Sequence, residues 1–282
     1  MKTRIIFGFM MIVAVAGLLY GDHWLESSAW AWTAGLPITV GLVLLAAAGL
    51  RELGKLTSAV GVKLLGLSGL LGVCGLASLP WWWPQVAETS PTGAVVFTAL
   101  SLTTAVVFAE QMIRARTKDA VRRVAVTMLA VVYLGAGSAL LLAVRMDFGV
   151  PTLLLVLAAV KFTDIGAYFT GSFIGRHKLI PWLSPGKSWE GLAGGIVAGA
   201  GIAVLSAAVL GPDTLALPRA AVLGAVLALA GQFADLCESL LKRSAEVKDT
   251  GAVVPEFGGV LDILDSPLLA APVAYALLML LM

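Results

Sequence analysis

Charged residues are scarce in this chain. Only 13% of its 282 residues are Asp, Glu, Lys or Arg, against about 25% in soluble domains, while 59% are hydrophobic and the mean hydropathy is +0.96. The sequence also contains no internal repeat, no low-complexity linker and no segment long enough for a soluble domain. This composition excludes a soluble globular protein and predicts an all-α, polytopic integral membrane protein.

Cysteine and histidine are almost absent. The two cysteines, Cys74 and Cys237, fall toward opposite membrane faces in the topology derived below, and no Cys/His spacing fits zinc. His23 and His177 are isolated in predicted loops, so we expect neither to be catalytic. A disulfide framework, a zinc site and histidine-based catalysis are therefore disfavoured.

The common nucleotide-binding motifs are missing too. Gly186-Lys187-Ser188 lacks the earlier glycine of a Walker loop, since residues 179–181 read Leu-Ile-Pro. No strand precedes the glycines, which excludes a dinucleotide fingerprint. No basic and aromatic platform for bases is visible, so nucleic acid is not an expected partner.

Long apolar runs are what the sequence has instead. A helix needs about 20 apolar residues to cross about 30 Å of hydrocarbon. The first run follows Lys2 and Arg4, as in a signal peptide, but it continues to Tyr20 and favours an uncleaved helix. We predict about nine transmembrane helices, at 4–21, 34–50, 60–79, 93–112, 124–144, 150–171, 189–211, 219–241 and 266–282.

The basic residues predict the orientation. With the N-terminus in the cytoplasm and the C-terminus outside, only Arg145 and Arg219 fall in outside loops, and Lys161 lies within a span. Tryptophans of the first two outside loops are typical interfacial anchors. The other sixteen of the 19 basic residues fall inside: Lys2, Arg4, Arg51, Lys55, Lys63, Arg114, Arg116, Lys118, Arg122, Arg123, Arg176, Lys178, Lys187, Lys242, Arg243 and Lys248.

We expect a single membrane domain, in which residues 1–90 form the first three helices and residues 91–282 form helices 4–9 with the catalytic motifs. The longest hydrophilic stretches, 172–188 and 242–265, fall on the cytoplasmic side. The chemistry is therefore predicted in these loops and the adjoining helix ends.

The first candidate motif begins inside the sixth predicted span. Lys161 and Asp164 are three residues apart and share a helix face, where a charge costs about 2.5–3.5 kcal/mol on insertion scales. A structural ion pair is one interpretation. The other is a site, because glycines that permit close approach to a ligand follow, together with donors for phosphate oxygens at Ser184, Lys187 and Ser188.

The second candidate motif spans the end of the eighth predicted helix and the start of the ninth. Asp262 and Asp265 would project together if their segment is helical, and Gly258-Gly259 would let the loop pack closely. Carboxylates from two segments suit Mg²⁺, with substrate phosphates completing its shell. One helix face upstream carries Asp235, Glu238, Ser239 and Lys242.

Together these motifs resemble the phosphatidate cytidylyltransferase (CDP-diacylglycerol synthase) family over roughly residues 90–282. The family's C-terminal signature, approximately S-x-x-K-R-x4-K-D-x5-P-G-H-G-G-x-x-D-R-x-D, departs here at Glu256, Phe257 and Ile263. Its upstream elements match at Asp164, Ala167, Tyr168, Ser184, Pro185, Lys187, Ser188, Glu190 and Gly191. The signature itself matches at Ser239, Lys242, Arg243, Lys248, Asp249, Pro255, Gly258, Gly259, Asp262 and Asp265.

The resemblance implies transfer of a cytidylyl group from CTP to phosphatidate, giving CDP-diacylglycerol and pyrophosphate in phospholipid biosynthesis. It also implies Mg²⁺, with a second cation left open, and a homodimer in a membrane that we take to be the bacterial inner membrane, with a cytoplasmic active site. The expected metal ligands are Asp235, Asp262, Asp265 and Asp249. Catalytic roles fall to these acids and Lys248, and substrate binding to Asp164, Tyr168, Ser184, Lys187, Ser239, Lys242, Arg243, Gly258 and Gly259.

Other interpretations remain open at this stage. The departures at Phe257 and Ile263 suit a CTP-dependent enzyme with another lipid acceptor, or a non-catalytic relative that binds lipid or nucleotide. A cation-coupled transporter would also place charges in spans, but it usually shows repeated halves and charges near the midplane. The acids here cluster toward one side, so we favour the enzyme.

Overall fold

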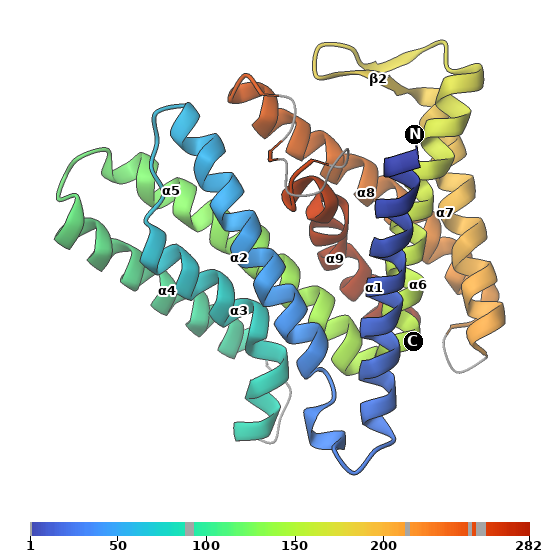
Figure 1. The fold of residues 1–282 in the computed structure, drawn as a ribbon, viewed down its shortest axis with the longest axis horizontal. Helices are drawn as coiled ribbons and strands as arrows, with labels where there is room; N and C mark the ends of the chain where they lie inside the picture. Colours follow the sequence, from blue (N-terminus) through green and yellow to red (C-terminus); the bar gives the residue numbers. More distant parts are fainter. Residues whose placement is uncertain (1, 88–92, 212–214, 248–249, 252–257) are drawn as a thin grey trace. The chain divides into compact units, whose positions relative to one another are not determined.

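The computed structural model describes residues 2–87, 93–211, 215–247, 250–251 and 258–282 (Figure 1). Side chains are described for these residues except 2–9 and 12. The chain divides into two compact units. The first unit contains residues 1–146 and 244–263, and the second contains residues 147–243 and 264–282.

The first unit is a group of helices joined by short connections. Helix α3 packs against both α2 and α4, and α4 packs against α5, as the blue to green ribbons of Figure 1 show. A π-helical segment, η2, continues α5 and packs against α3. The elements are α1 (Lys2–Glu26), η1 (Ala31–Thr33), α2 (Leu36–Ala59), α3 (Gly66–Ala87), α4 (Gly93–Arg114), α5 (Ala120–Ala130), η2 (Val131–Ala136) and the beginning of α6 (Gly137–Ile174).

A buried ion pair ties α1 to the first part of α6. The Arg145 Nε lies 2.6 Å from Asp22 Oδ2, and its guanidinium also lies 2.8 Å from Glu26 Oε1. The second Asp22 oxygen accepts a hydrogen bond of 2.7 Å from the Gly35 amide at the start of α2. Arg145, expected in an outside loop, is thus a buried structural residue of the first unit.

Helix α6 is interrupted at Gly149, whose φ of 83° only glycine adopts readily. Pro151 follows, and a proline within a helix removes a backbone hydrogen bond. The break falls between the predicted spans 124–144 and 150–171, close to the boundary between the two units. The two spans are therefore parts of one interrupted helical stretch.

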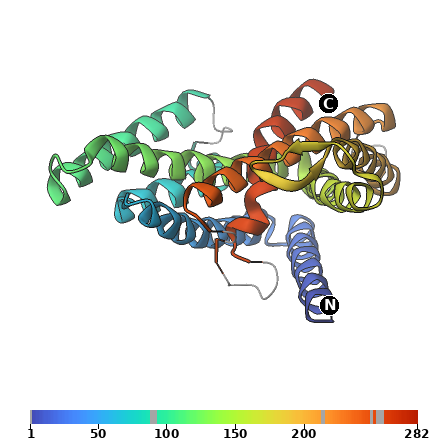
Figure 2. The same ribbon diagram turned by 90° about the horizontal axis from the view of Figure 1, so that it is seen from above.

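The second unit consists of helices and a small hairpin. Strands β1 (Lys178–Ile180) and β2 (Ser184–Ser188) pair antiparallel between α6 and α7, a hairpin that the sequence analysis left as a loop. The hairpin extends from the ends of α6 and α7 toward α8 (Figures 1 and 2). The remaining helices are α7 (Trp189–Leu210), α8 (Leu217–Ser244) and α9 (Leu261–Leu281).

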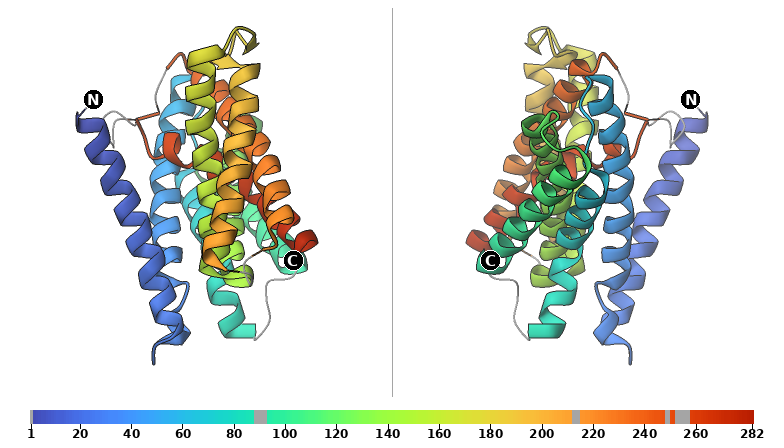
Figure 3. Two further views of the ribbon diagram at one scale, coloured as in Figure 1. Left: turned by 90° about the vertical axis from the view of Figure 1, so that its right-hand side faces the viewer. Right: turned by 90° about the vertical axis from the view of Figure 1, so that its left-hand side faces the viewer.

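Small residues let α6, α7 and α8 approach closely in this unit, and Figure 3 (left) shows α6 and α7 running side by side. A Cβ atom added to Gly194 would lie 2.0 Å from Thr170 Oγ1, and one on Gly224 would lie 2.5 Å from the Gly199 carbonyl oxygen. Both distances are too short for any side chain. Such contacts are typical of helix packing in membranes, where close backbone approach replaces the hydrophobic effect.

The all-α prediction is confirmed, and the polytopic class is supported by six helical stretches long and apolar enough to cross a membrane in the described part of the chain. They are 31–59, 93–114, 120–174, 189–210, 217–244 and 261–281.

Several predicted helix ends were wrong. The second predicted span ended at Leu50, but α2 continues to Ala59 through Arg51, Glu52 and Lys55. The ninth was expected from residue 266, but α9 begins at Leu261. Charged residues end an apolar run without ending helical hydrogen bonding, so hydropathy shortened both helices.

Candidate active site

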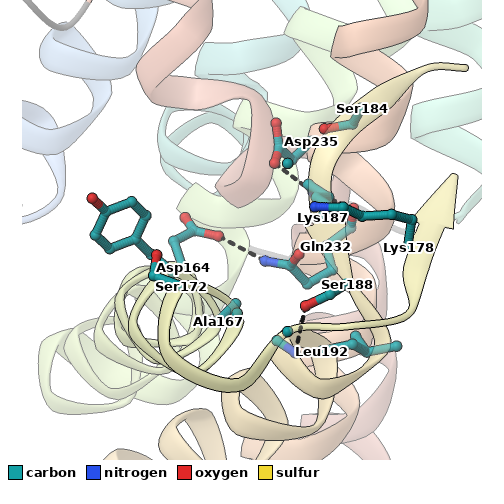
Figure 4. A pocket seen from close by; sticks show the side chains of 15 residues that line it. Asp164, Ala167, Ser172, Lys178, Ser184, Lys187, Ser188, Leu192, Gln232 and Asp235 are labelled. Carbon is teal, nitrogen blue, oxygen red and sulfur yellow. Dashed lines mark hydrogen bonds and ion pairs between the residues drawn. The ribbon is translucent and has the colours of Figure 1, made fainter. Parts of the chain in front are cut away.

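A cavity of about 610 Å³ lies within the second unit, beneath the hairpin. It is enclosed by the C-terminal half of α6, both strands, the start of α7 and the middle of α8, and Figure 4 shows the side chains that line it. Gly191 and Leu192 line it from α7. Polar and charged groups of α6, the two strands and α8 face it: Asp164, Tyr168, Ser172, Lys178, Ser184, Lys187, Ser188, Gln232 and Asp235. The first motif and part of the second therefore share one cavity.

Three contacts connect the hairpin and α6 to α8 across this cavity. Lys187 on β2 lies with its Nζ 2.5 Å from Asp235 Oδ2 and donates a hydrogen bond of 3.3 Å to the Gln232 carbonyl oxygen. The Gln232 amide nitrogen donates to Asp164 Oδ1 at 3.1 Å (Figure 4). Both charged groups are half-buried, so a phosphate entering the cavity would meet a positioned ammonium group.

The base of the hairpin is fixed by the first turn of α7. Ser188 is the N-cap of that helix and accepts a hydrogen bond from the Gly191 amide at 3.1 Å. Glu190 accepts hydrogen bonds from the backbone amides of Arg176 and His177 and contacts His177 Nδ1 at 2.6 Å. His177 is thus a partner of Glu190 on the exposed edge of the hairpin. These contacts position the strand that carries Lys187.

Three carboxylates of the second unit converge beside the cavity. Asp235 and Glu238 on α8 and Asp265 on α9 each offer an oxygen, and these oxygens lie within 4.8 Å of one another. Asp265 is 4% exposed and Glu238 only 1%. An all-oxygen, acidic set of this size suits a hard divalent cation such as Mg²⁺ and does not suit a metal that prefers sulfur or nitrogen.

Lysine ammonium groups contact two members of this carboxylate cluster. Lys242 lies one turn after Glu238 and donates to its Oε2 at 2.7 Å, which confirms that the two residues share a helix face. Lys187 contacts Asp235 in the same way. The cluster therefore combines close negative charges with the cations that the sequence analysis assigned to phosphate binding.

Asp262, in the first turn of α9, accepts hydrogen bonds from residues that precede this helix in the first unit. Its Oδ2 accepts hydrogen bonds from the Gly259 amide at 2.6 Å, the Thr250 amide at 3.1 Å and the Thr250 hydroxyl at 2.9 Å. Such bonds fix the carboxylate in one orientation at the start of α9, where a helix N-terminus favours negative charge.

The glycine pair before α9 has a packing reason. Gly258 has φ 91°, and a Cβ atom there would lie 2.4 Å from Asp262 Oδ2. A Cβ atom on Gly259 would lie 2.3 Å from Thr250 Oγ1 and 2.4 Å from Glu52 Oε2. The close packing expected of this pair is confirmed, and the contacts seen are with two carboxylates.

The remaining predicted residues occupy varied positions. Tyr168 lines the cavity but is 70% exposed, and Ser184 lines it from β2. Ser239 is half-buried on α8, and Arg243 is exposed in its last turn. Lys248 and Asp249, together with Pro255, Glu256 and Phe257, lie outside the described residues.

Three residues at or near these motifs were not predicted to act. Gln232 bridges Asp164 and Lys187, and Glu238 completes the carboxylate cluster. A signal existed for Glu238, since it shares a helix face with Asp235 and Lys242. Glu52 contacts the loop before α9 from a helix about 200 residues earlier, and no sequence spacing could have indicated that contact.

Comparison with known proteins agrees with these motifs. The model of the cytidylyltransferase family matches residues 2–281. The chain belongs to this family. The family match thus includes the first 90 residues, which the motif resemblance did not reach.

Individual relatives support the assignment. The phosphatidate cytidylyltransferase of Bacillus subtilis (strain 168) is 33% identical over 249 residues, covering 86% of this chain and 89% of the relative. That of Staphylococcus aureus (strain COL) is 31% identical over 251 residues, covering 86% and 90%. The Mycobacterium leprae (strain TN) enzyme is 41% identical over 126 residues, which span 45% of this chain and 40% of the relative.

Proposed function

We propose that this member of the cytidylyltransferase family transfers a cytidylyl group from CTP to phosphatidate, forming CDP-diacylglycerol and pyrophosphate. The observation that carries the proposal is the agreement of two independent features. Relatives that align with 86% of the chain bear the name phosphatidate cytidylyltransferase. The second unit also has an acidic cluster beside a lysine-containing cavity, the combination that phosphoryl chemistry requires.

The reaction requires neutralisation of the substrates' negative charges and does not require an activated side chain as nucleophile. A phosphate oxygen of phosphatidate attacks the α-phosphorus of CTP, the bond from that phosphorus to the bridging oxygen breaks, and pyrophosphate leaves with the electron pair. Both reactants are polyanions, so their approach and the developing charge on pyrophosphate must be stabilised by cationic groups. The nucleophile comes from the substrate, which fits a cavity without a Ser-His or Cys-His pair among its lining residues.

Lys187 is the best-placed residue for a substrate phosphate. It enters the cavity from β2 and is held by Asp235 and the Gln232 carbonyl oxygen. Ser184 offers a hydroxyl donor on the same strand. We assign Lys187 and Ser184 to phosphate oxygens of either substrate, and Lys242, Arg243 and Lys248 to the triphosphate.

Asp235, Glu238 and Asp265 would hold Mg²⁺, because their oxygens form a compact acidic set. Asp262 and Asp249 remain ligand candidates on the strength of the sequence, with a second cation as an open alternative. When bound, Mg²⁺ would neutralise phosphate charge and hold the phosphates in line for displacement. In such a complex Lys187 and Lys242 would exchange their carboxylate partners for phosphate oxygens.

The membrane arrangement belongs to the same proposal. Nine spans with a cytoplasmic N-terminus would place both motif loops on the side where CTP is available, with sixteen basic residues on that side. The lipid headgroup would reach the site at the bilayer surface of the bacterial inner membrane. A homodimer is the assembly that the family resemblance suggests.

The test is product formation by the purified protein in detergent micelles. CTP labelled in its α-phosphate, phosphatidate and Mg²⁺ should yield labelled CDP-diacylglycerol and an equal amount of pyrophosphate, and EDTA should stop both. Folded protein that forms no labelled lipid under these conditions would refute the proposal.

A different lipid acceptor is the second candidate, favoured by Ile263, which replaces a family arginine in the first turn of α9. Without the guanidinium, the site lacks a group that can bind a phosphate through two hydrogen bonds. Offering polyprenyl phosphate and ether-linked phosphatidate beside the diacyl lipid separates the candidates. If the protein transfers the cytidylyl group faster to polyprenyl phosphate or to ether-linked phosphatidate, that lipid is the acceptor in place of diacyl phosphatidate.

A further inference from the structure

Glu52 is a buried acid of the first unit that none of the motifs includes. It lies near the end of α2 and is 3% exposed. Its Oε1 accepts a hydrogen bond from the Val260 amide at 2.9 Å, and its Oε2 accepts from the Leu261 amide at 2.8 Å and the Thr250 hydroxyl at 3.1 Å. The carboxylate thus caps the start of α9 from a distant helix.

The glycines of the motif loop make room for this carboxylate. A Cβ atom on Gly251 would lie 2.8 Å from Glu52 Oε1, and one on Gly259 would lie 2.4 Å from Glu52 Oε2. Side chains at either position would push Glu52 away from the amides it contacts. Two glycines of the loop are therefore explained by Glu52.

Glu52 and Asp262 are linked through Thr250. The single Thr250 hydroxyl lies 3.1 Å from Glu52 Oε2 and 2.9 Å from Asp262 Oδ2, and it can donate its proton to one of them at a time. Asp262 also depends on the Gly259 amide, one residue before the first amide that Glu52 holds. Any movement of Glu52 therefore changes the donors that orient Asp262.

We infer that Glu52 is a positioning residue for the reaction, which acts by fixing the loop and the helix start that orient Asp262. The inference rests on the proposed function, in which Asp262 is a candidate metal ligand. Groups that orient the ligands of a metal typically change metal affinity or activity about 10- to 100-fold when they are replaced. Glu52 would thereby act on the reaction only through Asp262, within the first unit.

Glu52→Gln is the sharpest substitution, because it keeps size and removes one acceptor. Both Glu52 oxygens face donors, so the glutamine NH₂ group must point at an amide or hydroxyl that also donates. We expect the Mg²⁺ concentration for half-maximal rate to rise about 10- to 100-fold. Hydrogen exchange at the amides of Val260 and Leu261 should accelerate.

Glu110→Gln is the matched control. Glu110 is also buried, at 7% exposure, and accepts a hydrogen bond of 2.6 Å from the Ser68 amide near the start of α3. It makes the same kind of contact with a helix that carries no motif residue. We expect faster hydrogen exchange near Ser68. The Mg²⁺ requirement should stay within about twofold of wild type, far below the change expected when a group that orients a metal ligand is replaced.

The outcomes separate this inference from the proposed function. If wild type is active and the two variants show the same Mg²⁺ requirement after correction for folded protein, Glu52 has only a structural role and the inference fails. If wild type transfers no cytidylyl group, the proposed function fails, and Mn²⁺ binding followed by electron paramagnetic resonance decides the inference. Weaker Mn²⁺ binding in Glu52→Gln alone supports it, and equal binding in all three proteins overturns it.

Discussion

The two units use their buried acids in opposite ways. In the first unit, Asp22 meets Arg145 and the Gly35 amide, while Glu52 and Glu110 accept hydrogen bonds from backbone amides at helix starts. In the second unit, the oxygens of Asp235, Glu238 and Asp265 crowd within 4.8 Å of one another. The acids of the first unit have backbone amides or an arginine as partners. The acids of the second unit lie close to one another and need positive charge nearby.

The difference has a physical basis. A buried carboxylate is tolerated when amides or a guanidinium replace its lost water, as in the first unit. Neighbouring carboxylates repel one another, and lysines or a bound cation must offset that repulsion. Replacing an acid of the first kind should therefore lower stability, and should alter the reaction only where that acid orients a site residue, as we infer for Glu52. Replacing an acid of the second kind should lower turnover directly.

The largest expected effect is on stability, from Asp22→Asn. The substitution leaves Arg145 buried without its main counter-charge, and breaking a buried pair in this way costs about 3–5 kcal/mol. The midpoint of unfolding by sodium dodecyl sulfate in mixed micelles should fall sharply, while the rate per folded molecule should remain unchanged. Glu26→Gln, which alters a more exposed contact of the same arginine, is the control and should have a smaller effect. A normal midpoint for Asp22→Asn would mean that this pair does not stabilise the first unit.

Asp235→Asn should show the reverse behaviour. It removes one charge from the cluster and the partner of Lys187, so we expect kcat to fall about 100-fold. The unfolding midpoint should not fall, because repulsion within the cluster decreases. Asp147→Asn in the same unit is the control, since Asp147 is exposed and accepts a hydrogen bond from Tyr275. Loss of stability in parallel with loss of rate would remove the distinction between the units.

Lys187→Met tests whether the cavity binds phosphate. Loss of one charge-assisted contact should raise KM for CTP or phosphatidate about tenfold, equivalent to about 1.4 kcal/mol. Lys178→Met is the comparison, because the exposed Lys178 lines the same cavity from strand β1. Initial rates at varied CTP and phosphatidate would show which substrate each lysine serves. Equal effects of the two substitutions would indicate a general electrostatic field with no specific contact.

Ser188→Ala should have the smallest effect, on stability. The second unit also contains a structural cap, since Ser188 accepts a hydrogen bond from the Gly191 amide. Loss of an N-cap costs about 1 kcal/mol. Ser78→Ala removes a hydroxyl that donates a hydrogen bond to a carbonyl oxygen of its own helix. It should change the free energy of unfolding by less than about 0.5 kcal/mol. Equal midpoints for both variants would show that the α7 cap is unimportant.

Much of the secondary structure could be predicted from the sequence because it depends on local composition. Apolar runs predicted most helices of the described chain, but several helix ends were wrong, as where α2 continues through Glu52 to Ala59. The predicted spans 124–144 and 150–171 also belong to one helical stretch that is interrupted at Gly149. The hairpin of residues 178–188 was missed, because its strands are only three and five residues long and its base is held by contacts of Ser188 and Glu190 at the start of α7. Local patterns do not contain such contacts.

The candidate site was partly predictable for the same reason. Asp235, Glu238 and Lys242 share a helix face by spacing alone, and the structure confirms this. The contact of Lys187 with Asp235 joins residues 48 positions apart, and that of Glu52 with Leu261 joins residues 209 apart. Distances of this kind depend on which helices pack together.

By itself, the sequence determined that this is a helical membrane protein, and its motif spacing indicated the cytidylyltransferase family, because hydropathy and motif residues are local properties of the chain. Only the tertiary structure decided which acids share a site and which are satisfied by amides. It grouped Glu238 with Asp235 and Asp265, and it placed Glu52 against the loop that holds Asp262. The physical reason is that the cost of a buried carboxylate is set by its neighbours in space, which sequence position does not reveal.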